Sequence, residues 1–293
     1  MQILTGKLFK EMVLCGANTL HNNHPEIDAL NVFPVPDGDT GTNMSMTFNA
    51  GAAEIKDMDS DNIYDIAKKL SKGLLMGARG NSGVILSQIF RGFAMGLEGH
   101  ESVDAVAFAN AWKSGAEVAY KAVMKPVEGT ILTVAKVTAE KAVACARETE
   151  DFNEFAEVVI KEANAILKKT PDMLPVLKEA GVVDSGGQGL VEFLQGAVDV
   201  LSGKEVDLSG VERVAKKPAA TQTEAPLEEK DIKFGYCTEF IVMTKEEISM
   251  EEEQKFKDFL MGIGDSIVVV ADEDIIKVHV HTNHPGKAIE KGL

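Results

Sequence analysis

Apolar residues recur at intervals of three and four along most of the first 203 residues of the chain. That spacing places them on one face of an α-helix and is typical of amphipathic helices that pack around a shared core. Glycine and proline interrupt the pattern at most of the joints. The sequence therefore predicts about eight helices, at residues 4–20, 43–55, 63–76, 84–97, 103–123, 131–146, 155–167 and 191–201. Period-two runs of β-branched residues are absent here, so the predicted class of this part is all-α.

The pattern changes after residue 210. Residues 206–231 contain two prolines and no aromatic residue, and they predict a linker because they cannot bury enough apolar surface to offset their ordering entropy. Beyond it, residues 234–243, 266–271 and 275–281 predict strands, residues 251–261 predict a helix, and Pro285 begins another. The predicted organisation is multidomain: an all-α domain at 1–205, the linker, and a smaller α+β domain at 232–293. Because the chain stops within that last helix, we expect a C-terminal truncation of a longer protein.

Charge and composition narrow the function. The chain has 30 basic and 46 acidic residues, a net charge of −16, which repels nucleic-acid backbones and anionic membrane surfaces. No apolar run approaches the roughly 20 residues of a membrane-spanning helix. Three widely spaced cysteines cannot all pair, which indicates a reduced, cytoplasmic protein. An acidic protein can still handle phosphates if it recruits divalent metal ions.

Residues 31–44, NVFPVPDGDTGTNM, form the most informative segment. Its two prolines favour an extended approach, in which Asp37 and Asp39 point to one side. Gly38 permits close approach of a ligand, and the segment leads into the N-terminus of a helix near Asn43, where anions are favoured. These carboxylates can lie beside a bound phosphate if a Mg²⁺ ion is coordinated by both groups. Taken singly, Asp39 or Thr40 could be an ordinary helix cap and Asp37 a turn residue.

Three further loops precede predicted helices. Residues 77–83, GARGNSG, include Ser82 and Gly83 as a plausible phosphate nest, with Arg79 as a nearby cation. Thr130 begins another helix, and Asp184 precedes the glycines of residues 183–189, VDSGGQG. Each is individually more typical of a helix joint than of a ligand site, but together they could form a nucleotide pocket at one end of a bundle. The sequence contains neither a P-loop nor a G-x-G-x-x-G motif after a strand, which excludes those phosphate-binding mechanisms.

The second domain carries a possible metal site. His279 and His281 alternate on a predicted strand, so both side chains leave the same face, and Cys237 lies on the first strand of the same domain. One Cys and two His are suited to Zn²⁺, and we expect a structural role that supports a thin core. His284 is a possible fourth ligand or merely a residue beside the next helix.

These motifs together resemble the ATP-binding subunit of bacterial fatty acid kinase, whose N-terminal domain is similar to the L subunit of dihydroxyacetone kinase. The resemblance rests on NVFPVPDGDTGTNM, GLLMGARGNSGVILSQIFRG, KPVEGTILTVA and GVVDSGGQGL, and it extends through GYCTEF and KVHVHT into the second domain. It implies an eight-helix barrel that binds ATP and two Mg²⁺ ions. The implied catalytic residues are Asp37, Asp39 and Thr42, with both aspartates as Mg²⁺ ligands. The implied nucleotide-binding residues are Thr40, Gly41, Asn43, Ser82, Gly83, Thr130, Asp184 and Gly186, and the implied zinc ligands are Cys237, His279 and His281.

The resemblance further implies phosphorylation of a fatty acid carboxylate, presented by a separate fatty-acid-binding protein, to an acyl phosphate used in phospholipid synthesis. Thr40 stands where the dihydroxyacetone kinase subunit has a histidine, and Asn31 stands near a further aspartate of that subunit. Both departures favour the fatty acid branch over a kinase for a small ketone or polyol. A non-catalytic nucleotide-binding scaffold is the other alternative. The family also suggests a homodimer, and a C-terminal domain for the lipid-binding partner, so we expect this chain to bind ATP but to phosphorylate poorly.

Overall fold

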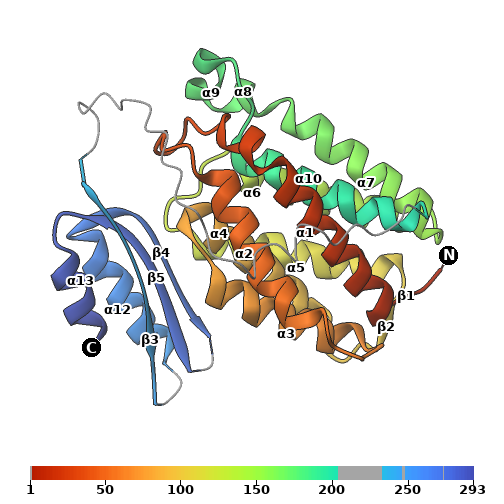
Figure 1. Cartoon of the computed structure of the whole chain (residues 1–293), viewed down its shortest axis with the longest axis horizontal. Helices are drawn as coiled ribbons and strands as arrows, with labels where there is room; N and C mark the ends of the chain where they lie inside the picture. The colour runs from red at the N-terminus through yellow and green to blue at the C-terminus, as the bar shows by residue number, and fades with distance from the viewer. Residues whose placement is uncertain (1, 204–232, 246–247, 273) are drawn as a thin grey trace.

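The structure, a computed structural model, describes residues 2–203, 233–245, 248–272 and 274–293. A helical part is followed by a smaller part in which two helices flank a three-stranded sheet (Figure 1). This arrangement confirms the predicted multidomain fold, mostly helical and then α+β. The predicted linker at 206–231 lies outside the described residues.

The helical part contains a long helix for each of the eight that the apolar pattern predicts. These are α1 (Gly6–Asp28), α2 (Thr40–Ile55), α3 (Ile63–Gly77), α4 (Gly80–Gly96), α5 (Ala105–Ala122), α6 (Ile131–Cys145), α7 (Phe152–Leu167) and α10 (Ser185–Leu201). Two short helices, α8 (Thr170–Met173) and α9 (Pro175–Ala180), were not predicted, because each is too short to show a period. The all-α prediction also missed two-residue strands, β1 (Leu4–Thr5) and β2 (Ser102–Val103), which pair antiparallel.

Four helices, α2, α4, α7 and α10, begin earlier than predicted, and three of them do so for a shared reason. The first turns of α2, α4 and α10 are built from glycine, serine, threonine and asparagine, which carry no hydrophobic period. The glycines at 41, 80, 186 and 187 therefore lie within helices and do not separate them. Small residues at these three ends leave backbone N–H groups accessible, which matters for the site described below.

The first helix continues past residue 20, where it was predicted to end, and runs through Pro25. A proline inside a helix leaves the carbonyl four residues earlier without its usual N–H partner. That carbonyl belongs to His21, and the His24 ring nitrogen Nδ1 lies 2.5 Å from it. A side chain thus replaces the missing backbone donor, and α1 reaches Asp28.

A cluster of aromatic rings holds α2, α4 and α10 together. Phe48 stacks on Phe193 with ring centroids 4.1 Å apart, and Phe90 meets both edge-on. All three rings are buried. Because these rings come one from each helix, the cluster fixes the relative positions of the helix N-termini.

The smaller part is built on an antiparallel sheet with strand order β3-β5-β4. Its strands are β3 (Tyr236–Met243), β4 (Gly264–Asp272) and β5 (Ile275–Thr282). Helices α12 (Met250–Met261) and α13 (Pro285–Gly292) cover one face, where Phe256 and Leu260 pack against Val269 and Val278.

The other face of the sheet packs on the helical part. Val268 and Val270 of β4 join Leu75 and Val84 in a second buried cluster. Arg91 of α4 lies 3.2 Å from the Asp272 carboxylate, and Val123, just after α5, forms a β-bridge with Val268. The sheet therefore lies between its own two helices and the helical part, as Figure 1 shows.

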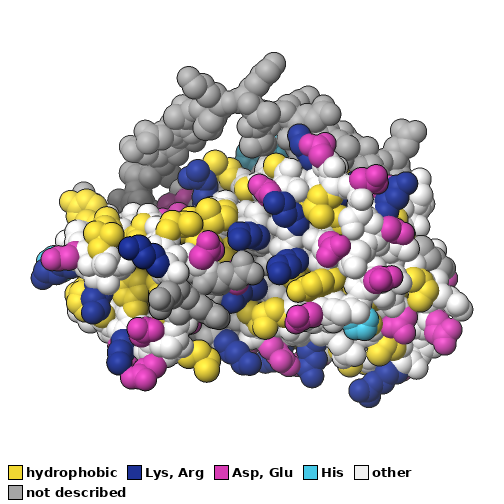
Figure 2. Space-filling view, turned by 90° about the horizontal axis from the view of Figure 1, so that it is seen from below, with side chains coloured by type: hydrophobic (Ala, Val, Ile, Leu, Met, Phe, Trp, Pro, Cys, Tyr) yellow, Lys and Arg dark blue, Asp and Glu magenta, His cyan; other side chains and the backbone are white. Residues whose placement is uncertain are grey.

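The surface agrees with the charge analysis. On the face shown in Figure 2, acidic and basic side chains are interspersed, so the excess negative charge does not gather there into one patch. Among the described residues, no helix is both long enough and apolar enough to cross a membrane.

Candidate functional site

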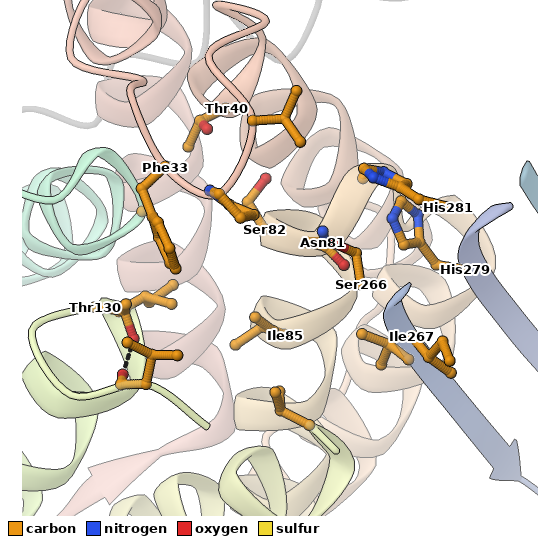
Figure 3. A pocket seen from close by; sticks show the side chains of 18 of the residues that line it. Phe33, Thr40, Asn81, Ser82, Ile85, Thr130, Ser266, Ile267, His279 and His281 are labelled. Carbon is orange, nitrogen blue, oxygen red and sulfur yellow. Dashed lines mark hydrogen bonds between the residues drawn. The ribbon is translucent and has the colours of Figure 1, made fainter. Parts of the chain in front are cut away.

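A cavity of about 370 Å³ lies between the helical part and the sheet. Its walls come from the starts of α2, α4 and α10, the loop before α2, the connection from α5 to α6, and strands β3, β4 and β5. Figure 3 shows Thr40 and Ser82 on the helical side, with His279 and His281 approaching from the sheet. Of the predicted site residues, the cavity brings together Asp37, Asp39, Thr40, Asn43, Ser82, Thr130, Asp184, Gly186, Cys237, His279 and His281.

The two aspartates before α2 form a close carboxylate pair. Burial, and then the charge of neighbouring Asp37, raise the pKa of Asp39 from 3.8 to about 6. Asn31 donates from Nδ2 to Asp37 Oδ1 at 2.7 Å, while its own Oδ1 is buried without a hydrogen-bond partner. Two crowded carboxylates beside an unsatisfied amide oxygen form a set of hard oxygen donors, which fits Mg²⁺.

Thr42 is turned away from this group. Its hydroxyl donates to Asp28 Oδ2 at 2.7 Å, and its backbone N–H donates to Asp28 Oδ1 at 2.9 Å. Thr42 is outside the cavity lining. Asp28, which sequence reasoning missed, thus satisfies an N–H in the first turn of α2 and ties that turn to the end of α1. Asp28 lies 14 residues before Thr42 at the end of an ordinary helix, so the sequence gave no signal of this role.

Gly41 and Gly83 are also outside the lining, and both are sites of close packing. A Cβ on Gly41 would lie 2.3 Å from the His24 carbonyl oxygen, and one on Gly83 would lie 2.3 Å from Thr47 Oγ1. These glycines let α2 approach α1 and α4 approach α2, so they shape the cavity from behind.

Replacing Gly41 by alanine is therefore expected to destabilise the protein by about 1–3 kcal/mol, because the methyl group meets rigid helical backbone. Urea denaturation would measure the change. The matched control is Gly286→Ala, since a Cβ there meets no atom within 4 Å. Equal stability of the two variants would contradict this explanation of Gly41.

The start of α4 forms one side of the cavity. Gly80 has a φ of +58° and lies so close to Asn43 that a Cβ would be 2.5 Å from Asn43 Nδ2. Asn81 and Ser82 line the cavity, whereas Arg79 does not. Arg79 instead donates its backbone N–H to Thr47 Oγ1 at 3.2 Å. The first turn of α4 therefore presents small polar side chains and helix N–H groups to the cavity, which suits an anion.

Thr130 and Asp184 lie at the opposite wall. Thr130 precedes α6 and donates its hydroxyl to the Val127 carbonyl at 2.8 Å. Asp184 caps α10 by accepting the Gly187 N–H at 2.7 Å, and a second N–H from Ile131 also reaches its carboxylate. Burial raises the pKa of Asp184 to about 6, although both N–H groups oppose the shift. Asp184 thus joins the starts of α6 and α10 as well as lining the cavity.

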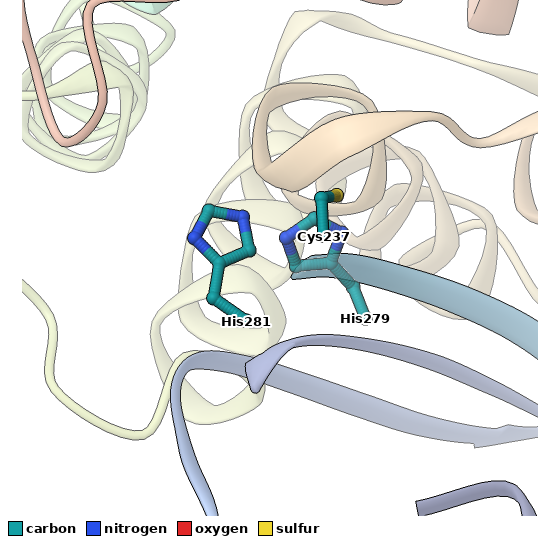
Figure 4. A group of neighbouring side chains, drawn as sticks. All are labelled: Cys237, His279 and His281. Atoms are coloured by element: carbon teal, nitrogen blue, oxygen red, sulfur yellow. The ribbon is translucent and has the colours of Figure 1, made fainter. Parts of the chain in front are cut away.

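Cys237, His279 and His281 lie together on the sheet face that is turned towards the helical part (Figure 4). Their ligand atoms are all within 4.8 Å of one another. The register of the strands brings this about, because Cys237 of β3 is directly opposite His281 of β5. His284 is not in the group; it precedes α13, and its N–H donates to Thr282 Oγ1.

The chemistry of this cluster fits zinc. His279 is 1% exposed, and its Nδ1 lies 2.8 Å from Glu239 Oε1 while its Nε2 is buried without a partner. Burial, followed by the charges of Glu239 and the aspartate pair, raises the pKa of Cys237 to about 11. Burial and His279 lower the pKa of His281. A thiol and two imidazoles, one held by a carboxylate, are a usual ligand set for Zn²⁺.

We had expected the Cys/His cluster to support the core of the smaller domain, but it lies on the opposite face of the sheet from that core. That core lies on the other face of the sheet, against α12 and α13. Cys237, His279 and His281 share their cavity with Asp37 and Asp39. Sequence reasoning also missed Glu239, although its two-residue spacing from Cys237 on a strand places both on one face.

Two family models match the chain, one in each of the two parts described above. Residues 34–199 match the model of the DAK2 domain, and residues 233–293 match that of the FakA-like middle domain of fatty acid kinase. Protein YloV of Bacillus subtilis is 47% identical over 293 residues, covering 99% of this chain and 53% of YloV. Uncharacterized protein SAB1090 of Staphylococcus aureus is 48% identical over 295 residues, with the same coverage. The chain thus spans about half the length of these curated relatives.

A solved structure shares the fold of the helical part. The dihydroxyacetone kinase from C. freundii, in complex with AMP-PNP and Mg²⁺, superposes with a TM-score of 0.52 at 18% sequence identity. The match covers 66% of this chain and 34% of that one.

Proposed function

Because the chain belongs to the DAK2 domain family, we propose that it transfers the γ-phosphoryl group of ATP to a fatty acid carboxylate, giving an acyl phosphate for phospholipid synthesis. The observation that carries the proposal is the shared cavity, in which the aspartate pair and the start of α4 face the sheet of a fatty acid kinase-like middle domain. The DAK2 domain indicates a kinase-related function. The bound AMP-PNP and Mg²⁺ of the C. freundii enzyme support the choice of ATP and Mg²⁺.

The residues divide the work between metal and phosphate binding. Asp37 and Asp39, with the unsatisfied Oδ1 of Asn31, would hold Mg²⁺. When bound, Mg²⁺ would neutralise charge on the phosphates as the γ-phosphoryl group departs. Ser82 and the first N–H groups of α4 would bind phosphate oxygens. Thr40, Asn43, Thr130 and Gly186 would line the rest of the nucleotide site.

A carboxylate acceptor suits the chemistry of the aspartate motif. A carboxylate is ionised at neutral pH and is itself the nucleophile, so its attack needs no general base. A ketone or polyol acceptor would give up a hydroxyl proton, and the dihydroxyacetone kinase resemblance implies a histidine where this chain has Thr40. The residues near Asp39 therefore favour the fatty acid acceptor.

The proposal includes two partners. A separate fatty-acid-binding protein would present the lipid, because the described cavity also has to hold ATP. A second copy of the chain would form a homodimer with the first. We place the reaction in the cytoplasm, where ATP is available; none of the three cysteines forms a disulfide. Zn²⁺ would be held by Cys237, His279 and His281.

The proposal is tested with the whole natural protein, because this chain covers only 53% of the length of YloV. ADP release would be followed with Mg²⁺·ATP and either oleate on a bacterial fatty-acid-binding protein or dihydroxyacetone, and acyl phosphate would be trapped with hydroxylamine. Acyl hydroxamate formed only with the lipid carrier is the expected result. Turnover with dihydroxyacetone alone would establish a small-polyol kinase, and ATP binding without turnover would establish a scaffold.

A further inference from the structure

Glu239 lies on β3 between the two candidate sites and contacts both. Its carboxylate is 2.8 Å from His279 Nδ1 on the neighbouring strand. The backbone N–H of Gly80, at the start of α4, also donates to it. The Glu239 side chain therefore accepts hydrogen bonds both from the Cys/His cluster and from the first turn of α4, which would bind phosphate.

On the cluster side, Glu239 determines which nitrogen of His279 carries the proton. A carboxylate accepts a hydrogen bond, so the neutral imidazole donates from Nδ1 and keeps the lone pair on Nε2. Nε2 is the atom that is buried without a partner. The carboxylate thus prepares His279 as a metal ligand.

On the nucleotide side, the bond from Gly80 places the first turn of α4. Gly80 packs directly against the Asn43 side chain, and Asn43 in turn bonds to Asp39. Asn81 and Ser82 follow Gly80 into the cavity. A displacement of the Glu239 carboxylate would therefore move the turn that faces the aspartate pair.

We propose that Glu239 is a positioning residue that couples metal binding at Cys237, His279 and His281 to Mg²⁺·ATP binding at the aspartate pair. His279 would hold the metal ion through Nε2, which would restrain its imidazole; the imidazole would in turn restrain the Glu239 carboxylate, and the carboxylate would restrain Gly80. The first turn of α4 then loses its conformational entropy before the nucleotide binds, so nucleotide binding is stronger. By thermodynamic reciprocity, bound nucleotide increases the affinity for the metal ion by the same factor. This coupling rests on the proposed nucleotide site.

Binding measurements on the full-length protein test the coupling without any need for turnover. The Kd of Mg²⁺·ATP would be measured by calorimetry on zinc-loaded protein and on protein stripped with a chelator. In the wild type we expect zinc to tighten nucleotide binding about fivefold or more. Zinc affinity, measured by competition with a chromophoric chelator, should rise by the same factor when Mg²⁺·ATP is present.

Glu239→Gln is the diagnostic variant, because its amide can donate to His279 Nδ1 and leave the proton on Nε2, the wrong tautomer for a ligand. We expect zinc affinity to fall about 10–100-fold and the effect of zinc on nucleotide binding to disappear. Glu239→Ala removes both bonds and should do the same. Glu290→Gln, on the exposed side of α13, is the matched control and should behave as the wild type.

The outcomes separate the two proposals. A wild-type Kd for Mg²⁺·ATP that is unchanged by zinc would overturn the coupling while leaving the kinase proposal standing. Failure of the wild type to bind zinc would also overturn the coupling. So would a Glu239→Gln variant that keeps both the wild-type zinc affinity and the wild-type effect of zinc on nucleotide binding. Failure to bind Mg²⁺·ATP under any condition would instead remove the proposed function itself.

Discussion

Replacing Asp39 by asparagine is expected to abolish phosphoryl transfer while making the ligand-free protein more stable at pH 7. Loss of a metal-binding carboxylate should lower turnover by about 10³-fold or more. Stability should move the other way, because the pKa of Asp39 rises from 3.8 to about 6 on folding, through burial and the charge of Asp37. The folded state therefore binds the proton more tightly, and ionisation at neutral pH costs it free energy.

The sign of the pH dependence follows from that shift. The stability that protonated Asp39 contributes is fully present below pH 3.8 and is lost as the pH rises through about 6. The stability gained by Asp39→Asn should therefore grow across this window and level off above it. Urea denaturation between pH 4 and 8, together with the hydroxamate assay, would measure both effects.

The exposed Asp57, just after α2, provides the matched control. Asp57→Asn should change neither turnover nor the pH profile of stability. Acyl phosphate formation by Asp39→Asn at the wild-type rate would remove Asp39 from the active site. If Asp39→Asn were less stable than the wild type at pH 7, repulsion between the Asp37 and Asp39 carboxylates would not destabilise the folded protein.

The second large effect concerns the cluster on the sheet. His279→Ala and Cys237→Ser should each reduce bound zinc from about one ion per chain to almost none, because only three protein ligands are available in the described cluster. Metal analysis after dialysis against a weak chelator would measure this. His284→Ala should retain zinc, since His284 lies outside the group.

Zinc binding should also release a proton from Cys237. Because the pKa of this thiol is about 11 in the metal-free protein, a thiolate ligand forms at neutral pH only by losing that proton to solvent. Zinc affinity should therefore rise about tenfold per pH unit between pH 7 and 9, and the weak affinity that Cys237→Ser retains should lack this slope. A flat profile in the wild type would exclude Cys237 as a thiolate ligand.

The sequence predicted the fold well where the apolar period was strong. It predicted the eight long helices and the three strands, because their buried faces repeat every 3.6 or every two residues. It placed the starts of α2, α4 and α10 too late, since glycine and serine carry no period. It ended α1 too early because nothing local shows that the His24 ring would bond the carbonyl that Pro25 leaves free.

The candidate site was predicted in outline but not in its connections. Motif residues such as Asp37 and His279 were identified because their types and spacing suit metal binding. Asp28 and Glu239 were not, since their partners lie 14 and 40 residues away and depend on how helices and strands meet. Nor could spacing show that the Cys/His cluster and the aspartates, about 200 residues apart in the chain, line one cavity.

The middle of β4 has neither side exposed to water, and this determines which mutations that strand can accept. Four consecutive residues of β4, Ile267 to Val270, are buried, because alternate side chains enter two different cores. An ordinary surface sheet tolerates polar substitutions at every second position. Here a saturation mutagenesis scan would find that neither the odd-numbered nor the even-numbered positions of this segment tolerate polar residues. Natural variation in the segment should therefore be confined to exchanges among aliphatic residues.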